Sequence, residues 1–234
     1  MNDISKKSAI SIGLWGAMLT FIGTLFSGLI SILLMILVKQ QPPWESVGTF
    51  IENYHVVQTV PFFFGFLLLS GSLCIFTSIY ILSEDKSKPL LGLIFASIGC
   101  GLVFLNYLTQ NTLIPALVKN YSIEYDSIID ILTMTNPLSM AWALEMWGYG
   151  LLGVGTWLVS GFFAKTSTEK IAKYLFVVNG VVSVIGALWT SFNLEWVYET
   201  EGLISYLLWN ILYILLAIYF SKVMRNRKRK LALD

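Results

Sequence analysis

Residues 143–158 read ALEMWGYGLLGVGTWL and contain two features that point to different kinds of protein. Gly148, Gly150 and Gly153 have the G-x-G-x-x-G spacing of a dinucleotide-binding turn, which needs a strand before it and a helix after it. Glu145, in contrast, is a carboxylate within a long, otherwise apolar run. The glycines lie in the middle of that run, which is long enough to cross a membrane. We therefore interpret the stretch as part of a membrane-spanning helix and the glycine spacing as accidental.

The composition of the whole chain agrees with this interpretation. Of its 234 residues 56% are hydrophobic and 12% charged, with a mean hydropathy of +0.72, whereas soluble domains carry about 25% charged residues. Six apolar stretches reach the roughly 20 residues that a helix needs to cross a bilayer, and none alternates as barrel strands do. They are 10–38, 60–82, 89–110, 138–164, 171–194 and 203–221. The sequence predicts an all-α membrane protein, a six-helix bundle forming one polytopic domain over residues 1–234.

Basic residues are distributed unequally between the two sides of this predicted bundle. Only Lys39 and Lys119 fall in connections on the side opposite the N-terminus. The other thirteen of the 15 are Lys6, Lys7, Lys86, Lys88, Lys165, Lys170, Lys173, Lys222, Arg225, Arg227, Lys228, Arg229 and Lys230. Because basic connections stay in the cytoplasm, we expect a multi-pass protein of the plasma membrane with both termini in the cytoplasm. Its basic tail, 222–234, attracts anionic lipids or only fixes the topology, and no other feature favours nucleic-acid binding.

The first two predicted outer connections contain short segments with helical periodicity. In the first, Trp44, Val47, Ile51 and Tyr54 share one face. The corresponding face of the second consists of Tyr121, Tyr125, Ile128 and Leu132. We expect one short amphipathic helix in each connection, at the membrane surface or over the end of the bundle.

The predicted helix 138–164 carries a polar stripe. Asn136 and Pro137 before it have the residue types of an N-cap and a first helical position. At about 100° per residue, the face of Glu145 is shared by Trp142, Tyr149, Leu152 and Thr156. The stripe predicts that this face of the helix points into the protein.

Glycines flank that stripe and recur in the first helix. Gly148 and Gly155 fall on one flank of it, and Gly150 and Gly153 on the other. Since glycines allow close approach of membrane helices, we expect a neighbouring helix on each side. The first predicted helix has a comparable ridge, formed by Gly16, Thr20, Thr24 and Gly28. This ridge predicts tight packing within the chain or a homo-oligomer formed through that helix.

An ionisable side chain within a span is costly, which makes Glu145 a functional-site hypothesis. Counting from the outer helix ends places other polar or aromatic residues at its depth, namely Asn106, Tyr107, Trp189, Thr190, Tyr206 and Asn210. In one interpretation Glu145 is protonated or hydrogen-bonded and only holds helices together. In the other it anchors a ligand in an outward-facing aromatic pocket. The predicted ligand-binding residues are Glu145, Trp142, Tyr149, Asn106, Trp189 and Asn210.

The residues that usually carry metal or catalytic chemistry are scarce. His55 is the only histidine, and no His, Cys, Asp and Glu residues have the spacing of metal ligands. Cys74 and Cys100 lie in apolar segments, where they suit packing rather than a disulfide. We expect no metal, no cofactor and no catalytic set.

Three functions remain open. The first is a non-enzymatic protein that binds, transports or senses a small organic molecule. The second is a membrane enzyme with Glu145 as general acid toward a lipid-soluble, isoprenoid-like substrate, and the third is a structural or regulatory subunit. The segment NPLSMAWALEMWGYGLLGVGTWLVSGFF, residues 136–163, resembles stretches of uncharacterised bacterial multi-span membrane proteins. That resemblance covers one helix and implies no activity.

Overall fold

The computed structural model describes residues 3–163 and 166–231, and within them every regular element is helical. Ala164, the last residue of the predicted fourth helix, lies outside the described residues, as do Lys165 and the end of the basic tail at 232–234. Five helical stretches are long and apolar enough to cross a membrane. They are Ile4–Val38, Val56–Leu82, Ser87–Lys119, Ser167–Thr190 and Thr200–Lys230. The chain is therefore compatible with a multi-pass membrane protein.

Two of these stretches contain a π-helical turn. The first consists of α1 (Asp3–Thr24), the π-turn η1 (Leu25–Ile30) and α2 (Ser31–Val38), and it starts before the predicted residue 10. The third consists of α5 (Ser87–Leu108), the π-turn η3 (Thr109–Leu113) and α6 (Ile114–Lys119), and it continues past the predicted residue 110. Between them, the 3₁₀ turn η2 (Val56–Thr59) leads into α4 (Val60–Leu82), which has the predicted bounds.

The predicted fourth stretch forms α8 (Met140–Val159) and the 3₁₀ turn η5 (Ser160–Phe162). The helix is 20 residues long but is not one of the five apolar stretches, because Glu145, three tryptophans, Tyr149 and four glycines lower its hydropathy. The predicted cap is wrong, since α8 begins after Ser139. Asn136 instead closes a turn, in which its Oδ1 accepts a hydrogen bond from the Leu138 N–H at 2.9 Å.

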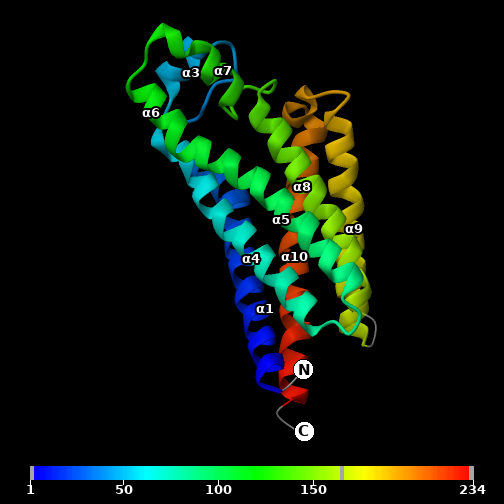
Figure 1. Cartoon of the computed structure of the whole chain (residues 1–234). Coiled ribbons are helices and arrows are strands. Elements are labelled where there is room, and N and C mark those ends of the chain that lie inside the picture. Colours follow the sequence, from blue (N-terminus) through cyan, green and yellow to red (C-terminus); the bar gives the residue numbers. More distant parts are fainter. Residues whose placement is uncertain (1–2, 164–165, 232–234) are drawn as a thin grey trace.

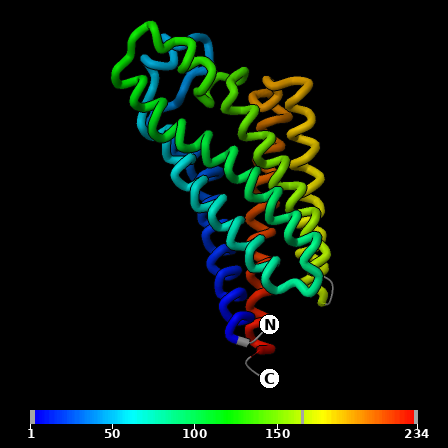
Figure 2. The backbone as a smooth tube through the Cα atoms, in the orientation of Figure 1, coloured from blue at the N-terminus to red at the C-terminus, as the bar shows by residue number. Residues whose placement is uncertain are grey.

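The remaining long helices are α9 (Ser167–Thr190) and α10 (Thr200–Lys230), joined through the 3₁₀ turn η6 (Glu195–Tyr198). Helix α1 packs against α4 and α10, α5 against α4 and α8, and α9 against α8 and α10. The six helices thus form a closed ring in chain order, with α1 beside α10 (Figures 1 and 2). The Asp3 end of α1, the Lys230 end of α10 and the α4–α5 connection lie at the same end of the ring (Figure 1).

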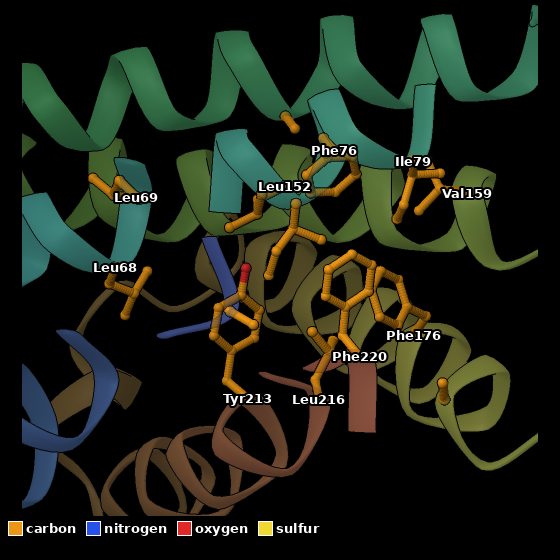
Figure 3. Close-up of a cluster of buried hydrophobic side chains, with 14 of the residues drawn as sticks. Leu68, Leu69, Phe76, Ile79, Leu152, Val159, Phe176, Tyr213, Leu216 and Phe220 are labelled. Atoms are coloured by element: carbon orange, nitrogen blue, oxygen red, sulfur yellow. The ribbon is translucent and has the colours of Figure 1, made fainter. Parts of the chain in front are cut away.

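The interior of the ring is filled by large apolar side chains from helices on different sides. Phe76 of α4, Leu152 of α8 and Tyr213 of α10 point into the same space (Figure 3) and are buried. Tyr213 keeps its hydroxyl in contact with a polar partner, since it lies 2.8 Å from the Ser72 hydroxyl. This packing leaves the α8 stripe facing the centre of the bundle.

Glycines bring α8 close to both of its neighbours. A Cβ on Gly148 would lie 2.9 Å from the Gly99 carbonyl oxygen of α5. On the other flank, a Cβ on Gly153 would lie 2.6 Å from the Ser183 Cβ of α9 and one on Gly150 2.5 Å from the Ala187 Cβ. The predicted arrangement, with a neighbouring helix on each side of the Glu145 stripe, is confirmed.

The small-residue ridge of the first helix is used within the chain. A Cβ on Gly16 would lie 2.8 Å from the Gly71 carbonyl oxygen of α4, and one on Gly28 would overlap the Asn210 side chain of α10. Tight packing of this ridge is thus explained without a second chain. Association of two chains through helix 1 stays a prediction.

Three short helices gather at one end of the molecule (Figure 1). Helices α3 (Val47–Asn53) and α7 (Asp126–Leu132) lie in the two predicted connections and share an apolar cluster with α6. In the second segment the predicted Tyr125 and Leu132 do pack on this cluster, but Ile129 is buried in place of the predicted Ile128, and Tyr121 is exposed. A 3₁₀ turn, η4 (Ile123–Tyr125), precedes α7. Its three residues per turn shift the helical phase.

Candidate functional site

Glu145 is buried at the contact between α5 and α8, with 7% of its surface exposed. Its Oε1 accepts a hydrogen bond from the Tyr107 hydroxyl at 2.7 Å, and its Oε2 accepts one from the Asn106 Nδ2 at 3.0 Å. Both donors are on α5, about two turns from Gly99, where α5 and α8 are in close contact. The carboxylate therefore joins the two helices through charge-assisted or neutral hydrogen bonds in a largely apolar surrounding.

The Tyr107 hydroxyl extends this contact to a second phenol. It lies 2.9 Å from the Tyr149 hydroxyl. Because Tyr107 donates its hydrogen to Glu145, Tyr149 must donate to Tyr107 in that arrangement. Space for the Tyr107 ring comes from Gly65 of α4, where a Cβ would lie 2.2 Å from the ring. A glycine on a third helix thus fixes the position of the donor to the carboxylate.

Beyond the phenols, the interior on the Tyr149 side is packed with aromatic rings. Tyr149 meets Trp209 edge-on with ring centroids 4.7 Å apart, and Trp209 stacks on Tyr213 at 4.7 Å. The Trp209 indole N–H donates to the Ser183 hydroxyl at 3.1 Å. The aromatic residues on this side contact one another and Glu145's hydrogen-bond partners.

A connecting segment covers the other side of the network. The Gln110 amide, one turn after Asn106, donates to the Leu132 carbonyl at 2.6 Å and accepts from the Met134 N–H at 3.1 Å. The Met134 carbonyl also accepts from the Trp142 indole at 2.8 Å. Four side chains contact Met134 in total: Asn106 of α5, Gln110 of η3, Trp142 of α8 and Tyr198 of η6.

The six predicted ligand-binding residues fall into two groups. Glu145, Asn106 and Tyr149 belong to one hydrogen-bonded network, and Trp142 joins it through Met134. Trp189 is 55% exposed and lies outside the network, and Asn210 donates to the Tyr206 carbonyl of its own helix beside Gly28. The expected depth along the membrane therefore identified residues of the network on α5 and α8, but not on α9 and α10.

A cleft of about 140 Å³ lies beside Asn106, on the face of the α5–α8 contact that points away from the centre of the bundle. Its lining is mostly aliphatic, and Asn106 supplies a buried polar side chain. The lining residues are Leu105, Asn106, Thr109, Leu132, Met140, Ala141 and Leu144. Glu145 does not line the cleft, but its carboxylate accepts a hydrogen bond from Asn106, which does.

Sequence reasoning placed Tyr107 at the right depth but did not include it in the site, and it missed Gln110 and Met134. Gln110 follows Asn106 by four residues, a spacing that places both on one helical face and could have indicated its role; Tyr107 is the next residue, about 100° around the helix. Met134 carries no such signal, because three of its four contacts are made by its backbone groups and only Asn106 meets its side chain.

Among the residues that the structure describes, no group of three or more His, Cys, Asp or Glu side chains is placed to hold a metal ion. The site offers one carboxylate, two phenols and two amides, which suit hydrogen bonding to a ligand rather than metal coordination. Comparisons with protein-family models, curated proteins and solved structures found no match.

Proposed function

We propose that this chain is a plasma-membrane protein that binds one small organic molecule in the α5–α8 cleft, with Glu145 as the anchor for its polar group. The observation that carries the proposal is that Asn106, which lines the cleft, donates a hydrogen bond at 3.0 Å to the buried Glu145 carboxylate. Burying a carboxyl group in a membrane span is costly. Recognition of a ligand in the neighbouring apolar cleft would account for a carboxyl group in this position.

The cleft and the carboxylate together define the ligand's chemistry. A cavity of about 150 Å³ accommodates benzene, so the cleft suits a ring-sized apolar group. An ionised carboxylate accepts about four hydrogen bonds, and contacts with Tyr107 and Asn106 use two. Because Asn106 separates the cleft from Glu145, a hydrogen-bond donor or a cation attached to that apolar group would reach the remaining acceptor positions by displacing the Asn106 side chain. Since Leu105 and Met140 at its rim are exposed to the surroundings of the bundle, the ligand would enter from the membrane.

We further propose six membrane spans, with both termini in the cytoplasm. The proposal adds α8 to the five apolar stretches, because its 20 residues extend about 30 Å, the thickness of the hydrocarbon core. Thirteen basic residues on the side of the termini support this orientation. Reporter fusions at both ends test it directly. Six spans place the two reporters on the same side, and five spans would place them on opposite sides.

The binding proposal is tested by identifying small molecules that co-purify with the protein. Wild type is compared with Glu145→Gln and Thr109→Phe, in which a phenyl ring is added to the cleft lining. The matched control is Leu108→Phe, because Leu108 is 50% exposed and does not line the cleft. Untargeted mass spectrometry should find a compound enriched with wild type and Leu108→Phe and reduced with the other two variants.

The Glu145→Gln variant keeps a hydrogen-bonding solution. Its amide oxygen can accept from Asn106 while its NH₂ donates to the Tyr107 hydroxyl, which then donates to Tyr149. Loss of the compound from a folded Gln variant would therefore report on the carboxyl group. Wild type without any enriched compound, or equal retention by all four proteins, would contradict the proposal. Glu145 would then have only the role of joining α5 to α8.

A further inference from the structure

A second cleft lies far from Glu145, where α9 begins and α10 ends. Its volume is about 240 Å³, and its lining is strongly charged. The lining residues are Thr166, Glu169, Val223, Asn226, Arg227, Arg229 and Lys230. Three of them are cationic and one is anionic, so the cleft carries a net positive charge. The proposed ligand site near the other end of the bundle does not account for it.

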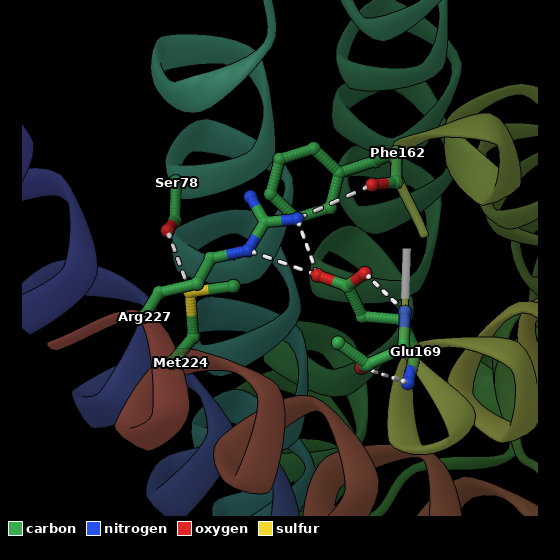
Figure 4. A network of polar contacts seen from close by, with 6 residues as sticks. Ser78, Phe162, Glu169, Met224 and Arg227 are labelled. Carbon is green, nitrogen blue, oxygen red and sulfur yellow. Dashed lines mark hydrogen bonds and ion pairs between the residues drawn. The ribbon is translucent and has the colours of Figure 1, made fainter. Parts of the chain in front are cut away.

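One wall of this cleft is built and held in place. The Arg227 Nη2 donates to the Glu169 Oε1 at 2.8 Å and to the Phe162 carbonyl at 3.3 Å, and its guanidinium lies 3.9 Å from the centre of the Phe162 ring (Figure 4). Glu169 also accepts from the Thr166 N–H in the capping box that starts α9. These contacts orient Arg227 and leave its Nη1 without a hydrogen-bond partner among the described residues.

The other cations of the cleft come from the last turn of α10. Arg229 and Lys230 are exposed and line it together with the Asn226 amide, one turn earlier. The positive end of the α9 dipole lies at the same place. The site therefore combines two cations, N–H donors on an oriented guanidinium and a side-chain amide, which is the donor set that recognises phosphate groups.

We propose that this cleft binds a phosphate-bearing anion, either the headgroup of an anionic phospholipid or free phosphate. The inference goes beyond the proposed function and concerns different residues. In the proposed orientation the cleft opens at the cytoplasmic membrane surface, where anionic headgroups are abundant. Arg229 and Lys230 contact the phosphate, and Arg227 forms the wall behind it.

Native mass spectrometry of the full-length protein in detergent tests the proposal without depending on membrane orientation. The probes are phosphatidylglycerol, zwitterionic phosphatidylcholine and inorganic phosphate. Arg229→Gln/Lys230→Gln removes the two cleft cations, whereas the control Arg225→Gln/Lys228→Gln removes two exposed charges that do not line the cleft. Thermal unfolding without lipid checks that each variant is folded.

Wild type should retain phosphatidylglycerol in preference to phosphatidylcholine. The cleft variant should lose affinity by about fivefold for each removed cation, and the control by less than about twofold because exposed charges are screened by salt. Inorganic phosphate that binds to wild type and displaces the lipid would identify free phosphate as the source, and binding that phosphate does not affect would identify the headgroup. Equal losses in both double variants, or no loss in either, would overturn the proposal. Failure of the Glu145 experiments would leave this result unaffected.

Discussion

Gly99→Ala tests the close contact between α5 and α8 on which the Glu145 site depends. A Cβ at residue 99 would lie 2.4 Å from the Gly148 carbonyl oxygen and 2.9 Å from the Leu152 nitrogen. Both atoms belong to the α8 backbone, so no side-chain rotation relieves the contact. The two helices would have to separate, and the hydrogen bonds from α5 to Glu145 would lengthen. Gly101→Ala is the matched control, because a Cβ there meets nothing within 4 Å.

The two substitutions should change the free energy of unfolding in different directions. Overpacking a close contact costs about 1–3 kcal/mol, and a hydrogen bond lost at Glu145 adds about 0.5–1.5 kcal/mol. Replacing glycine by alanine in a helix gains up to about 1 kcal/mol at either site. Gly99→Ala should therefore lower the free energy of unfolding by about 1–3 kcal/mol, whereas Gly101→Ala should leave it unchanged or raise it by up to about 1 kcal/mol.

Unfolding by sodium dodecyl sulfate from mild detergent, followed by tryptophan fluorescence, measures both free energies, since the chain has eight tryptophans. Comparing two alanines on one helix removes differences in expression, detergent and overall charge. If Gly99→Ala were as stable as Gly101→Ala, α5 would not present residue 99 to α8, and the geometry described for Glu145 would be refuted.

Further substitutions test the contacts around this centre and at the opposite end. Glu145→Leu should lower the free energy of unfolding by about 1–3 kcal/mol for each of the two stranded donors, whereas Glu145→Gln should cost less than half as much in the same titration. Gly65→Ala displaces the phenol that donates to Glu145 and should cost about 1–3 kcal/mol; Gly186→Ala meets the flexible end of a methionine at 3.3 Å and should be tolerated. Arg227→Gln breaks the ion pair with Glu169 and should cost about 1.5–3 kcal/mol, and a similar loss for exposed Arg225→Gln would contradict that role.

The packing of α8 could be predicted from the sequence because the angle between residues on one helix is fixed. Once Glu145 is assigned to the interior, the positions of Gly148 and Gly153 on opposite flanks follow from 3.6 residues per turn. The structure then supplies the partners that a single helix does not specify, namely α5 and α9. The all-helical fold follows in the same way from the length of the apolar stretches.

The rotation of the other helices about their own axes could not be predicted, and for that reason Trp189 and Asn210 were expected beside Glu145. Trp189 and Thr190 have almost the same depth, yet Thr190 is buried and Trp189 is exposed. Asn210 points to the Gly28 side of α10 rather than to Glu145. After α5, the π-turn η3 (Thr109–Leu113) changes the helical phase between Asn106 and the residues that follow Gln110. The role of Met134 depends on a connection whose path no helical pattern describes.

The central claim is that a small molecule occupies the α5–α8 cleft against Asn106, with the Glu145 carboxyl group behind it. An experimental density map of the protein purified from membranes into lipid nanodiscs tests this most directly. We predict non-protein density of ring size in the cleft, within hydrogen-bonding distance of the Asn106–Glu145 pair, and its loss in Thr109→Phe. A wild-type map in which the cleft is collapsed, or filled only by an acyl chain that makes no polar contact, would contradict the claim.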